Sequence, residues 1–354
     1  MRVLLDCRMA TWSGIGRYCM GLTRALHRTS GVEIVQMIAE GSEPPVPDAE
    51  VIEAARHPFR LAGALEFGRI AARSAPDITH ALHFPTPMPA RHPLIVTVQD
   101  LTPLVVEGVM PSAIRRGAYR RSMARAVSAA DRILTPSAFS ASDVVRFFPG
   151  AAGRTTPVLL AADDFTSGPV GRLPEWLEES RFILSMGNTR PHKDLPTLLR
   201  AFATLDAQDV LLVLAGEDPG GYALSVLGDH PAAQRVHFSG PIDDETLRAL
   251  FAGAEVLAVT SRYEGFGLPP LEAMSFGTPV VSSSAASLPE VVGDAALLVA
   301  PGDVEALRSA LDRVLSDVDL AQRLVHIGRE RALGFTWDTT AAGTVAVYRQ
   351  ALGV

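Results

Sequence analysis

The chain has 354 residues, of which 47% are hydrophobic and 20% are charged. This balance excludes a disordered chain, and the length suggests two domains. The net charge of −7 argues against general nucleic-acid binding. No apolar run reaches the roughly 18 residues that a membrane helix needs.

The distribution of charge and the number of cysteines bear on the domain organisation and the cellular compartment. Residues 1–170 carry a net charge of +3 and residues 171–354 a net charge of −10, which supports two domains and suits the first to an anionic partner. Cys7 and Cys19 are too few for a disulfide framework. Arg2–Leu5 meets Asp6 too early for the hydrophobic part of a signal peptide. We therefore expect a cytoplasmic protein.

Short apolar segments alternate with helical ones through the first half of the chain. In chain order we predict a strand at 2–6, a helix at 16–28, a strand at 32–39, a helix at 59–74, strands at 78–82 and 94–98, a helix at 111–130, a strand at 132–135 and a helix at 137–147. Proline and acidic residues at 41–48 predict a loop. The alternation favours a parallel sheet with helices on both faces.

A segment rich in glycine and proline, 163–175, interrupts this alternation and predicts a linker. After it we predict a strand at 182–186, a helix at 193–205, strands at 210–215 and 236–238, a helix at 244–252, a strand at 256–260, a helix at 268–276, strands at 280–282 and 296–299 and a helix at 304–315. The predicted fold class is α/β, with two Rossmann-like parallel-sheet domains. Ligands of such sheets bind at the carboxyl ends of the strands.

The sequence SGIGRY (13–18) joins the first strand to the first helix. Gly14 and Gly16 let a ligand approach the backbone, and a helix N-terminus attracts phosphate. A tight turn without a ligand explains the same residues. The motif is not a dinucleotide fingerprint, because its third glycine is Gly21, whereas the fingerprint needs position 19, which is Cys19.

The sequence GNTRPHKD (187–194) follows the strand that opens the second half. Lys193 is the only lysine in the chain, beside 31 arginines, which suggests a site that needs a compact point charge rather than a planar guanidinium. Its predicted position at a helix start suits a diphosphate. The alternative is a chance lysine on a solvated helix.

The sequence SRYEGFGLPPLEAM (261–274) follows the strand that ends near Thr260. Gly265 and Gly267 leave the backbone open, and the following helix presents free N–H groups. Glu264 precedes this turn and could hydrogen-bond a sugar, while Glu272, one turn into the helix, could accept hydrogen bonds from the two hydroxyls of a ribose. The alternative is an ordinary loop acid and an ordinary helical glutamate.

Six segments together resemble a known family. EGFGLPPLEAMSFGTPVVSS is similar to the Glu-x7-Glu signature of the family 4 (group 1) retaining glycosyltransferases, which have the GT-B fold. GNTRPHKDLPTLLRAF resembles their diphosphate-binding segment, and SGIGRY and VTVQDLTPL resemble their amino-terminal motifs. VHFSGPIDDETLRALFAGAEVLAVTS resembles the segment beside the base, and FTWDTTAAGTVAVYRQAL the last helix. Within this family, the chain resembles bacterial mannosyltransferases of polysaccharide biosynthesis.

The resemblance assigns roles to individual residues. Catalytic roles fall to Glu264 at the donor hexose, Lys193 at the leaving diphosphate, and the pair Gln99 and Asp100. The remaining donor-binding positions are Gly14, Gly16, Asn188 and Arg190 near the diphosphate, Ile242 at the base, the backbone of Gly265, Phe266, Gly267 and Leu268 at the diphosphate and sugar, and Glu272 at the ribose. The implied domains are an acceptor-binding domain at 1–165, a nucleotide-sugar-binding domain at 174–335, and a crossover helix at 336–354 that packs on the first.

Two positions depart from the family pattern. Gln99 stands where relatives usually have histidine, and it cannot take a proton near neutral pH. Asn188 stands where many relatives have arginine, for which Arg190 could compensate. His80 and His83 flank a predicted strand end, where they either contact an acceptor or pack in a loop.

The resemblance implies transfer of a hexosyl group from a nucleoside-diphosphate sugar to a hydroxyl of a glycan, a glycolipid or a small molecule, with retained configuration. GDP-mannose is slightly favoured as the donor, and UDP- and dTDP-sugars remain open. No cofactor and no metal are expected, because Asp-x-Asp is missing from any plausible position and Lys193 takes the metal's usual role. A noncatalytic nucleotide-sugar-binding protein, an epimerase and a phosphorylase remain as alternatives.

A cluster of arginines lies on the helix predicted at 111–130: Arg115, Arg116, Arg120, Arg121 and Arg125. One hypothesis is a basic amphipathic helix on an anionic membrane surface, which would bring the protein to the inner face of the cell membrane and to a lipid-linked acceptor. The alternative is a solvated helix face.

Overall fold

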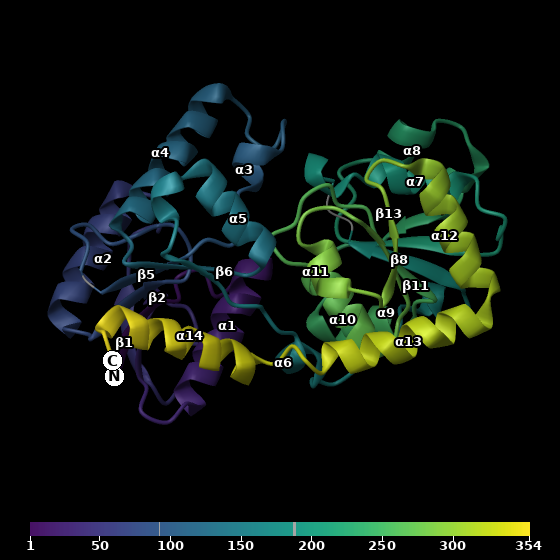
Figure 1. The fold of residues 1–354 in the computed structure, drawn as a ribbon. Helices are drawn as coiled ribbons and strands as arrows, with labels where there is room; N and C mark the ends of the chain where they lie inside the picture. The colour runs from purple at the N-terminus through teal and green to yellow at the C-terminus, as the bar shows by residue number, and fades with distance from the viewer. Residues whose placement is uncertain (92, 187–188) are drawn as a thin grey trace. The chain divides into compact units, whose positions relative to one another are not determined.

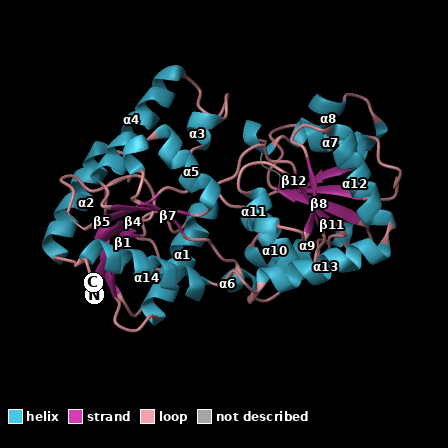
Figure 2. Cartoon of the chain, viewed as in Figure 1, coloured by secondary structure: helices cyan, strands magenta, loops and turns pink. Residues whose placement is uncertain are grey.

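The computed structural model describes residues 1–91, 93–186 and 189–354. The chain forms two compact units, each with a parallel sheet between layers of helices (Figure 1, Figure 2). Unit 1 comprises Met1–Val105, Met110–Ala161 and Thr336–Val354. Unit 2 comprises Val106–Val109 and Ala162–Phe335.

The sheet of unit 1 has the strand order β3-β2-β1-β4-β5-β6-β7. Its strands are β1 (Arg2–Asp6), β2 (Glu33–Ala39), β3 (Glu50–Ala54), β4 (Ile78–Ala81), β5 (Leu94–Thr97), β6 (Arg132–Thr135) and β7 (Thr155–Pro157). β1 pairs in parallel with both β2 and β4, so the order along the sheet reverses between β1 and β4. Doubly wound sheets bind ligands at such a reversal, beyond the carboxyl ends of the strands.

Helices cover both faces of this sheet, which explains why β1 is apolar almost throughout. Val3, Leu4 and Leu5 are fully buried. Phe67 of α2 and Met123 of α4 belong to the core on one face, and α1 packs with α14 on the other (Figure 1). The helices are α1 (Ser13–Arg28), α2 (Leu61–Ser74), α3 (Thr102–Val105), α4 (Ala113–Ala129), α5 (Ala138–Phe147) and α14 (Trp337–Leu352), with the 3-10 turn η1 (Pro149–Ala151).

The helix α14 is distant in sequence from the rest of unit 1 but is built into its core. Trp337 is 2% exposed, and a Cβ atom at Gly21 would overlap its indole ring. Gly21, the glycine that follows Gly14 and Gly16, is therefore needed to make room for the Trp337 indole. At the other end of α14, the Tyr348 hydroxyl lies 2.6 Å from Nδ1 of the fully buried His80.

The sheet of unit 2 has the strand order β10-β9-β8-β11-β12-β13, with the reversal between β8 and β11. Its strands are β8 (Phe182–Met186), β9 (Leu211–Ala215), β10 (Val236–Phe238), β11 (Val256–Val259), β12 (Val280–Ser283) and β13 (Ala296–Val299). Its helices are α6 (Asp163–Thr166), α7 (Leu195–Ala203), α8 (Tyr222–Leu227), α9 (Asp244–Gly253), α10 (Leu268–Phe276), α11 (Leu288–Val292), α12 (Val304–Ser316) and α13 (Val318–Ala332), with 3-10 turns η2 (Glu175–Leu177), η3 (Pro191–Lys193) and η4 (Pro231–Arg235).

The segment 163–175, predicted as a linker, is instead packed on unit 2. Phe165 is buried against the rings of Phe251 and Phe276, with centroids 6.2 Å from each. Arg248 donates to the carbonyl of Phe165 at 2.8 Å and to that of Pro169 at 2.9 Å. Glycine and proline therefore mark irregular backbone here, and its carbonyls are satisfied by a buried guanidinium.

The predicted elements agree best with the structure where apolar residues are continuous. The strands at 2–6, 132–135, 182–186, 236–238 and 296–299 and the helix at 268–276 have the predicted bounds. The edge strand β3 was not predicted, because it is mostly exposed and Val51 within it is 37% exposed. The helix α13 was not predicted either, since few of its side chains are buried.

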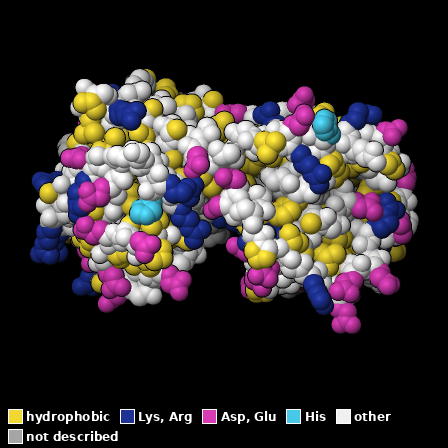
Figure 3. Space-filling view, turned by 90° about the horizontal axis from the view of Figure 1, so that it is seen from below, with side chains coloured by type: hydrophobic (Ala, Val, Ile, Leu, Met, Phe, Trp, Pro, Cys, Tyr) yellow, Lys and Arg dark blue, Asp and Glu magenta, His cyan; other side chains and the backbone are white. Residues whose placement is uncertain are grey.

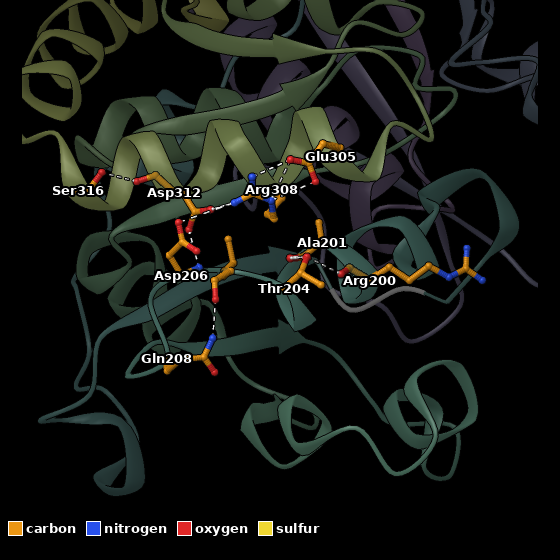
Figure 4. Close-up of polar contacts among 10 residues, drawn as sticks. Arg200, Ala201, Thr204, Asp206, Gln208, Glu305, Arg308, Asp312 and Ser316 are labelled. Atoms are coloured by element: carbon orange, nitrogen blue, oxygen red, sulfur yellow. Dashed lines mark hydrogen bonds and ion pairs between the residues drawn. The ribbon is translucent and has the colours of Figure 1, made fainter.

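A polar network on unit 2 joins α12 to the segment that follows α7 (Figure 4). Arg308 pairs with Asp312 at 2.6 Å and with Glu305 at 2.7 Å. Asp312 also accepts the backbone N–H of Asp206 at 3.0 Å. This network fastens α12 to the segment after α7.

The face drawn in Figure 3 has no single dominant charge. On the face drawn in Figure 3, basic and acidic side chains are intermixed rather than gathered into one basic tract. Among the helices that the structure describes, none is both long and apolar enough to cross a membrane.

Candidate functional site

The candidate site of unit 2 lies at the reversal point of its sheet. The turn η3 follows β8 and carries Lys193, while the loop after β11 carries Glu264. Because β8 and β11 are parallel neighbours, their carboxyl ends lie at the same edge. The structure thus brings together the two residues that the sequence singled out 71 positions apart.

The backbone at Lys193 corrects the prediction of a helix from residue 193. Lys193 ends the 3-10 turn η3, and α7 begins only at Leu195. Asp194 between them has a left-handed backbone, with φ of 49°. Aspartate tolerates that conformation, and here its carboxylate accepts hydrogen bonds from Thr197 and Arg262, both at 2.9 Å.

Hydrogen bonds fasten this turn to the loop after β11. The Thr260 hydroxyl donates to the Lys193 carbonyl at 2.8 Å. The Arg262 N–H donates to the His192 carbonyl at 2.7 Å. Two turns from different strands are therefore held in one register before any ligand binds.

Serines fix the loop that carries Glu264. The Ser261 hydroxyl donates to Oε1 of Glu264 at 2.6 Å. The Ser287 hydroxyl lies 2.9 Å from the Glu264 carbonyl and 2.5 Å from the Phe266 carbonyl, so it can donate to either. Ser283 donates to the Ser261 carbonyl. Sequence reasoning missed these serines, although the run 282–284, which ends the buried strand β12 and continues one residue past it, is a signal that could have found Ser283.

Lys193 and Glu264 form an ion pair in the centre of the site. The Lys193 ammonium donates to Oε1 of Glu264 at 2.6 Å, and their side chains are 19% and 18% exposed. Burial raises the pKa of Glu264, but the charge of Lys193 and the hydrogen bonds from Lys193 and Ser261 outweigh it and hold that pKa below its ordinary value. Glu264 is therefore ionised at neutral pH.

The pair lines a cavity of about 20 Å³ whose lining also includes Ser185, Gly267 and Leu288. A cavity of that size holds about one water molecule. A ligand phosphate therefore cannot enter behind the pair and must approach the Lys193 ammonium from its solvent side.

The helix α10 begins directly after the Glu264 loop. Gly267 precedes it with φ of 134°, a conformation open to glycine, and Leu268 is its first residue. Because Pro269 and Pro270 lack N–H groups, Leu268 supplies the only amide of these first three positions. Phe266 is 4% exposed and Glu272 2% exposed, so both are fixed within unit 2, while Gly265 is half-buried.

A second hollow, of about 310 Å³, opens at the ends of β8 and β9. Its lining is Met186, Ala215, Gly216, Glu217, Gly240, Pro241, Ile242 and Leu247. Met186 also lines the cavity of the ion pair, so the two hollows adjoin. Ile242, which was predicted to contact the nucleotide base, is half-buried in this lining. Glu217, which sequence reasoning missed, is the one ionisable residue among the lining residues.

Arg190 directly precedes the turn that carries Lys193. Arg190 is exposed at the residue before η3. Asn188 lies outside the residues that the structure describes.

The remaining predicted residues lie in unit 1. Gly14 and Gly16 stand in the first turn of α1. A Cβ atom at Gly16 would collide with the Ala10 carbonyl oxygen, so that glycine is required by its own loop. A Cβ at Gly14 would meet nothing within 4 Å, so the space beside that residue is open to a ligand.

Gln99 and Asp100 follow β5 and make contacts within unit 1. The Gln99 amide donates to the Leu82 carbonyl at 3.2 Å, which ties the end of β5 to the end of β4. The Asp100 carboxylate accepts the Thr102 N–H at 2.7 Å at the start of α3. Both residues therefore position backbone at the carboxyl edge of the unit 1 sheet.

The unit 2 site combines charges and shapes suited to an anionic, ring-bearing ligand. A fixed ammonium and an ionised carboxylate stand together beside a hollow with apolar walls. An ammonium stabilises a phosphate, and a carboxylate stabilises a neighbouring cationic centre or accepts hydroxyl hydrogen bonds. The apolar hollow suits a flat ring.

Comparisons with known proteins agree with these features. The family model described as "Glycosyl transferase 4-like domain" matches residues 13–161, and that described as "Glycosyl transferases group 1" matches residues 174–331. The chain is 39% identical over 227 residues to MMP alpha-(1->4)-mannosyltransferase of Mycolicibacterium hassiacum, covering 62% of this chain and 54% of that protein. It is 34% identical over 242 residues to O-antigen chain mannosyltransferase B of Escherichia coli, covering 65% and 63%. The chain thus spans about half to two thirds of the length of these relatives.

Solved structures support the fold over the whole chain. A sucrose-phosphate synthase from Thermosynechococcus elongatus superposes with a TM-score of 0.81 at 23% identity, covering 100% of this chain and 99% of that one. Anabaena HepE, solved in complex with UDP and glucose, superposes with a TM-score of 0.74 at 16% identity, covering 99% and 100%. The predicted α/β fold class, with two Rossmann-like parallel-sheet units of the GT-B type, is confirmed.

Proposed function

The chain belongs to the group 1 glycosyl transferases, and on that premise we propose that it moves a hexosyl group from a nucleoside-diphosphate sugar to a hydroxyl, with retained configuration. The observation that carries the proposal is the Lys193–Glu264 ion pair at the reversal point of the unit 2 sheet. A fixed cation beside a fixed carboxylate matches a transition state in which the leaving diphosphate gains negative charge and the sugar gains positive charge.

In the proposed reaction the bond between the anomeric carbon and the diphosphate oxygen breaks. The acceptor oxygen bonds to the same carbon on the same face, and its proton passes to the departing phosphate oxygen. The protein then supplies positioning and charge rather than a covalent intermediate. Lys193 would stabilise the leaving diphosphate, so we propose that turnover needs no divalent cation.

The ion pair gives each partner a defined task. When the donor binds, its phosphate would compete with Glu264 for the Lys193 ammonium. Glu264 would keep its hydrogen bond from the Ser261 hydroxyl, at 2.6 Å, and so stay in place. Its negative charge, no longer paired with Lys193, would then stabilise the positive charge on the sugar. The serine contacts to its backbone prevent the loop from following the lysine.

Gln99 bears on which group accepts the proton of the acceptor hydroxyl. A neutral amide that donates to the Leu82 carbonyl does not serve as a proton acceptor. We therefore propose that Gln99 and Asp100 act as positioning residues at the edge of unit 1. The proton would be left to the departing phosphate.

The donor that we propose is GDP-mannose. The relatives named above are mannosyltransferases, and Glu217 in the second hollow favours guanine. Guanine offers two neighbouring N–H donors along one edge, which a carboxylate can accept together. Uracil offers one N–H, and the carbonyl oxygen on each side of it repels a carboxylate.

A nucleotide titration tests the donor. We expect GDP to bind more tightly than UDP or ADP, and Glu217→Gln to weaken GDP about 10- to 100-fold, since one charge-assisted pair is lost. Isothermal titration measures the affinities, and Glu179→Gln, an exposed acid outside the hollow, is the control for loss of charge. Tighter binding of UDP, or an unchanged GDP affinity in Glu217→Gln, would reject the guanine proposal.

The same titrations precede a turnover assay that separates the transferase from an epimerase and from a noncatalytic binding protein. Release of GDP from GDP-mannose that depends on an acceptor, with excess chelator present, supports the transferase. Conversion of the donor without an acceptor would indicate an epimerase. Binding without either reaction would indicate a noncatalytic binding protein, and turnover lost on adding chelator would refute metal independence.

The acceptor that we propose is a glycan, either free or carried by a lipid at an anionic membrane surface. Residues 111–118 are exposed, Ile114 is 85% exposed, and Arg115, Arg116, Arg120 and Arg121 surround this end of α4. The hypothesis of an amphipathic helix with a free apolar face is wrong for α4, because its apolar residues Met123, Ala126 and Val127 are buried in unit 1. Charge and one exposed isoleucine therefore support the membrane proposal, rather than a broad apolar face.

Vesicle sedimentation tests this surface. We expect the protein to bind vesicles that contain anionic lipid at low salt and not to bind neutral vesicles. The triple variant Arg115→Gln, Arg120→Gln, Arg121→Gln should lose about 100-fold in vesicle affinity, at about 1 kcal/mol for each charge. Equal binding of the triple variant and the wild type would reject α4 as the contact.

A further inference from the structure

A cluster of aromatic rings at the carboxyl edge of the unit 1 sheet has no part in the site described above. Trp12 lies in the loop after β1, and His57 and Phe59 lie in the loop after β3. Trp12 and Phe59 are near-parallel, with ring centroids 5.6 Å apart, and His57 lies 6.0 Å from Trp12 and 5.9 Å from Phe59. We call these three residues the aromatic platform.

The platform is open to solvent. Trp12 is 36% exposed and Phe59 is 41% exposed, and His57 is exposed as well. Single exposed aromatic side chains are ordinary, but three in mutual contact from two separate loops form a continuous surface. The loops leave β1 and β3, so the platform stands beside the β1/β4 reversal, where doubly wound sheets bind ligands.

A buried polar atom lies directly against the platform. His83, in the loop after β4, packs edge-on to Phe59 with centroids 5.8 Å apart and is 8% exposed. Its Nδ1 is buried and has no hydrogen-bond partner among the residues that the structure describes. Burial without a partner costs free energy that a ligand can recover.

Electrostatics at this position favour a neutral ligand group. Burial lowers the pKa of His83 to about 4, although the nearby charge of Asp6 raises it, so the ring is neutral at pH 7. Asp6 is itself fully paired, since Arg8 donates to both of its carboxylate oxygens, at 2.8 and 2.7 Å. Asp6 and Arg8 thus satisfy each other, and a hydroxyl suits His83 better than an ion does.

We propose that the aromatic platform and His83 bind a pyranose ring of a glycan. The C–H face of the sugar would stack on Trp12 and Phe59, and a hydroxyl would hydrogen-bond His83. A lipid chain would gain from the rings but would leave the buried nitrogen unsatisfied, so the sugar is the better match. The proposal rests on the proposed function only in making this glycan the acceptor.

Saccharide binding without any nucleotide tests the proposal. Methyl α-D-mannopyranoside and an α-linked mannotriose are titrated up to about 20 mM, a range suited to weak sites, with saturation-transfer NMR as the readout. We expect transfer from aromatic protons to the sugar. Trp12→Ala and Phe59→Ala should each weaken the affinity about three- to tenfold, the range for one aromatic contact.

The chain offers a matched control in unit 2. Trp176 is 45% exposed and lies 5.2 Å from the ring of His237, so Trp176→Ala removes a similar exposed indole beside a histidine. That variant should bind saccharide like the wild type. His83→Phe keeps a buried ring but removes the nitrogen, and it should weaken binding while its melting temperature stays close to that of the wild type.

Two outcomes would overturn the proposal: saccharide signals that are absent or unchanged in Trp12→Ala, and anionic vesicles that bind through Trp12 when saccharides do not. Failure here is distinct from failure of the proposed function. Nucleotide binding with no saccharide binding rejects the platform alone. Saccharide binding at the platform with no nucleotide binding rejects the transferase alone.

Discussion

Replacing Lys193 with alanine is expected to lower turnover by about 100- to 1000-fold, the usual cost of removing one group that stabilises transition-state charge. Nucleoside-diphosphate affinity should fall as well, because the ammonium at 2.6 Å from Glu264 is a cation fixed between the two site turns. Lys193→Arg should recover little of the turnover, since a planar guanidinium needs more room than the ammonium has beside Ser261 and Glu264. Steady-state release of nucleoside diphosphate measures both variants.

The lysine variant also disturbs the fold locally, and a second substitution separates the two effects. Without Lys193 the Glu264 carboxylate keeps its burial and loses its counterion, so its pKa should rise and the variant should be less stable at neutral pH. Adding Glu264→Gln removes that charge and should restore the melting temperature but not the turnover. Turnover of Lys193→Ala within threefold of the wild type would refute the assigned role of the lysine.

Unit 1 should lose stability as the pH falls below neutrality, and His80 should account for much of the loss. His80 is fully buried, with Nδ1 2.6 Å from the Tyr348 hydroxyl and Nε2 2.8 Å from the Thr97 hydroxyl, and burial lowers its pKa to about 3. The unfolded chain binds a proton below its ordinary value of 6.5, while the folded chain does not. Stability therefore falls at about 1.4 kcal/mol per pH unit between those values.

His80→Gln should lower stability at pH 7 and flatten this dependence. Between pH 6.5 and 4.5 the wild type should lose about 3 kcal/mol through His80 that the variant does not lose. The urea midpoint of Trp337 fluorescence, with Trp12 and Trp176 replaced by phenylalanine, reports on unit 1. His326→Gln is the control, since that side chain is 75% exposed. Parallel pH profiles for His80→Gln and the wild type would contradict the assignment.

The sequence predicts most of the sheet architecture because parallel strands covered on both faces are continuously apolar. Val3, Leu4 and Leu5 carry that signal, and so do the buried residues of β8. The edge strand β3 escapes prediction because hydrogen bonding to β2 places it, rather than burial of its own side chains. The segment 163–175 was misread because composition does not reveal that Arg248 satisfies its carbonyls.

The candidate site follows the same division. Lys193 and Glu264 were identifiable because each is unusual in its own local sequence, and the parallel pairing of β8 with β11 brings them together. Ser287 and Glu217 were not, since their value comes from contacts between segments that are separated in the chain. His83 could be noticed in the sequence, but its unpartnered nitrogen is a property of the packed loop alone.

The place of α14 in unit 1 sets an order of assembly during synthesis. Trp337 fills the space over Gly21, and Tyr348 bonds the buried His80, so the amino-terminal sheet lacks part of its core until α14 has left the ribosome. Residues 162–335 are translated before α14, and they contain nearly all of unit 2. The unit encoded second can therefore finish folding first, while the first remains open to chaperones for the time needed to translate the second.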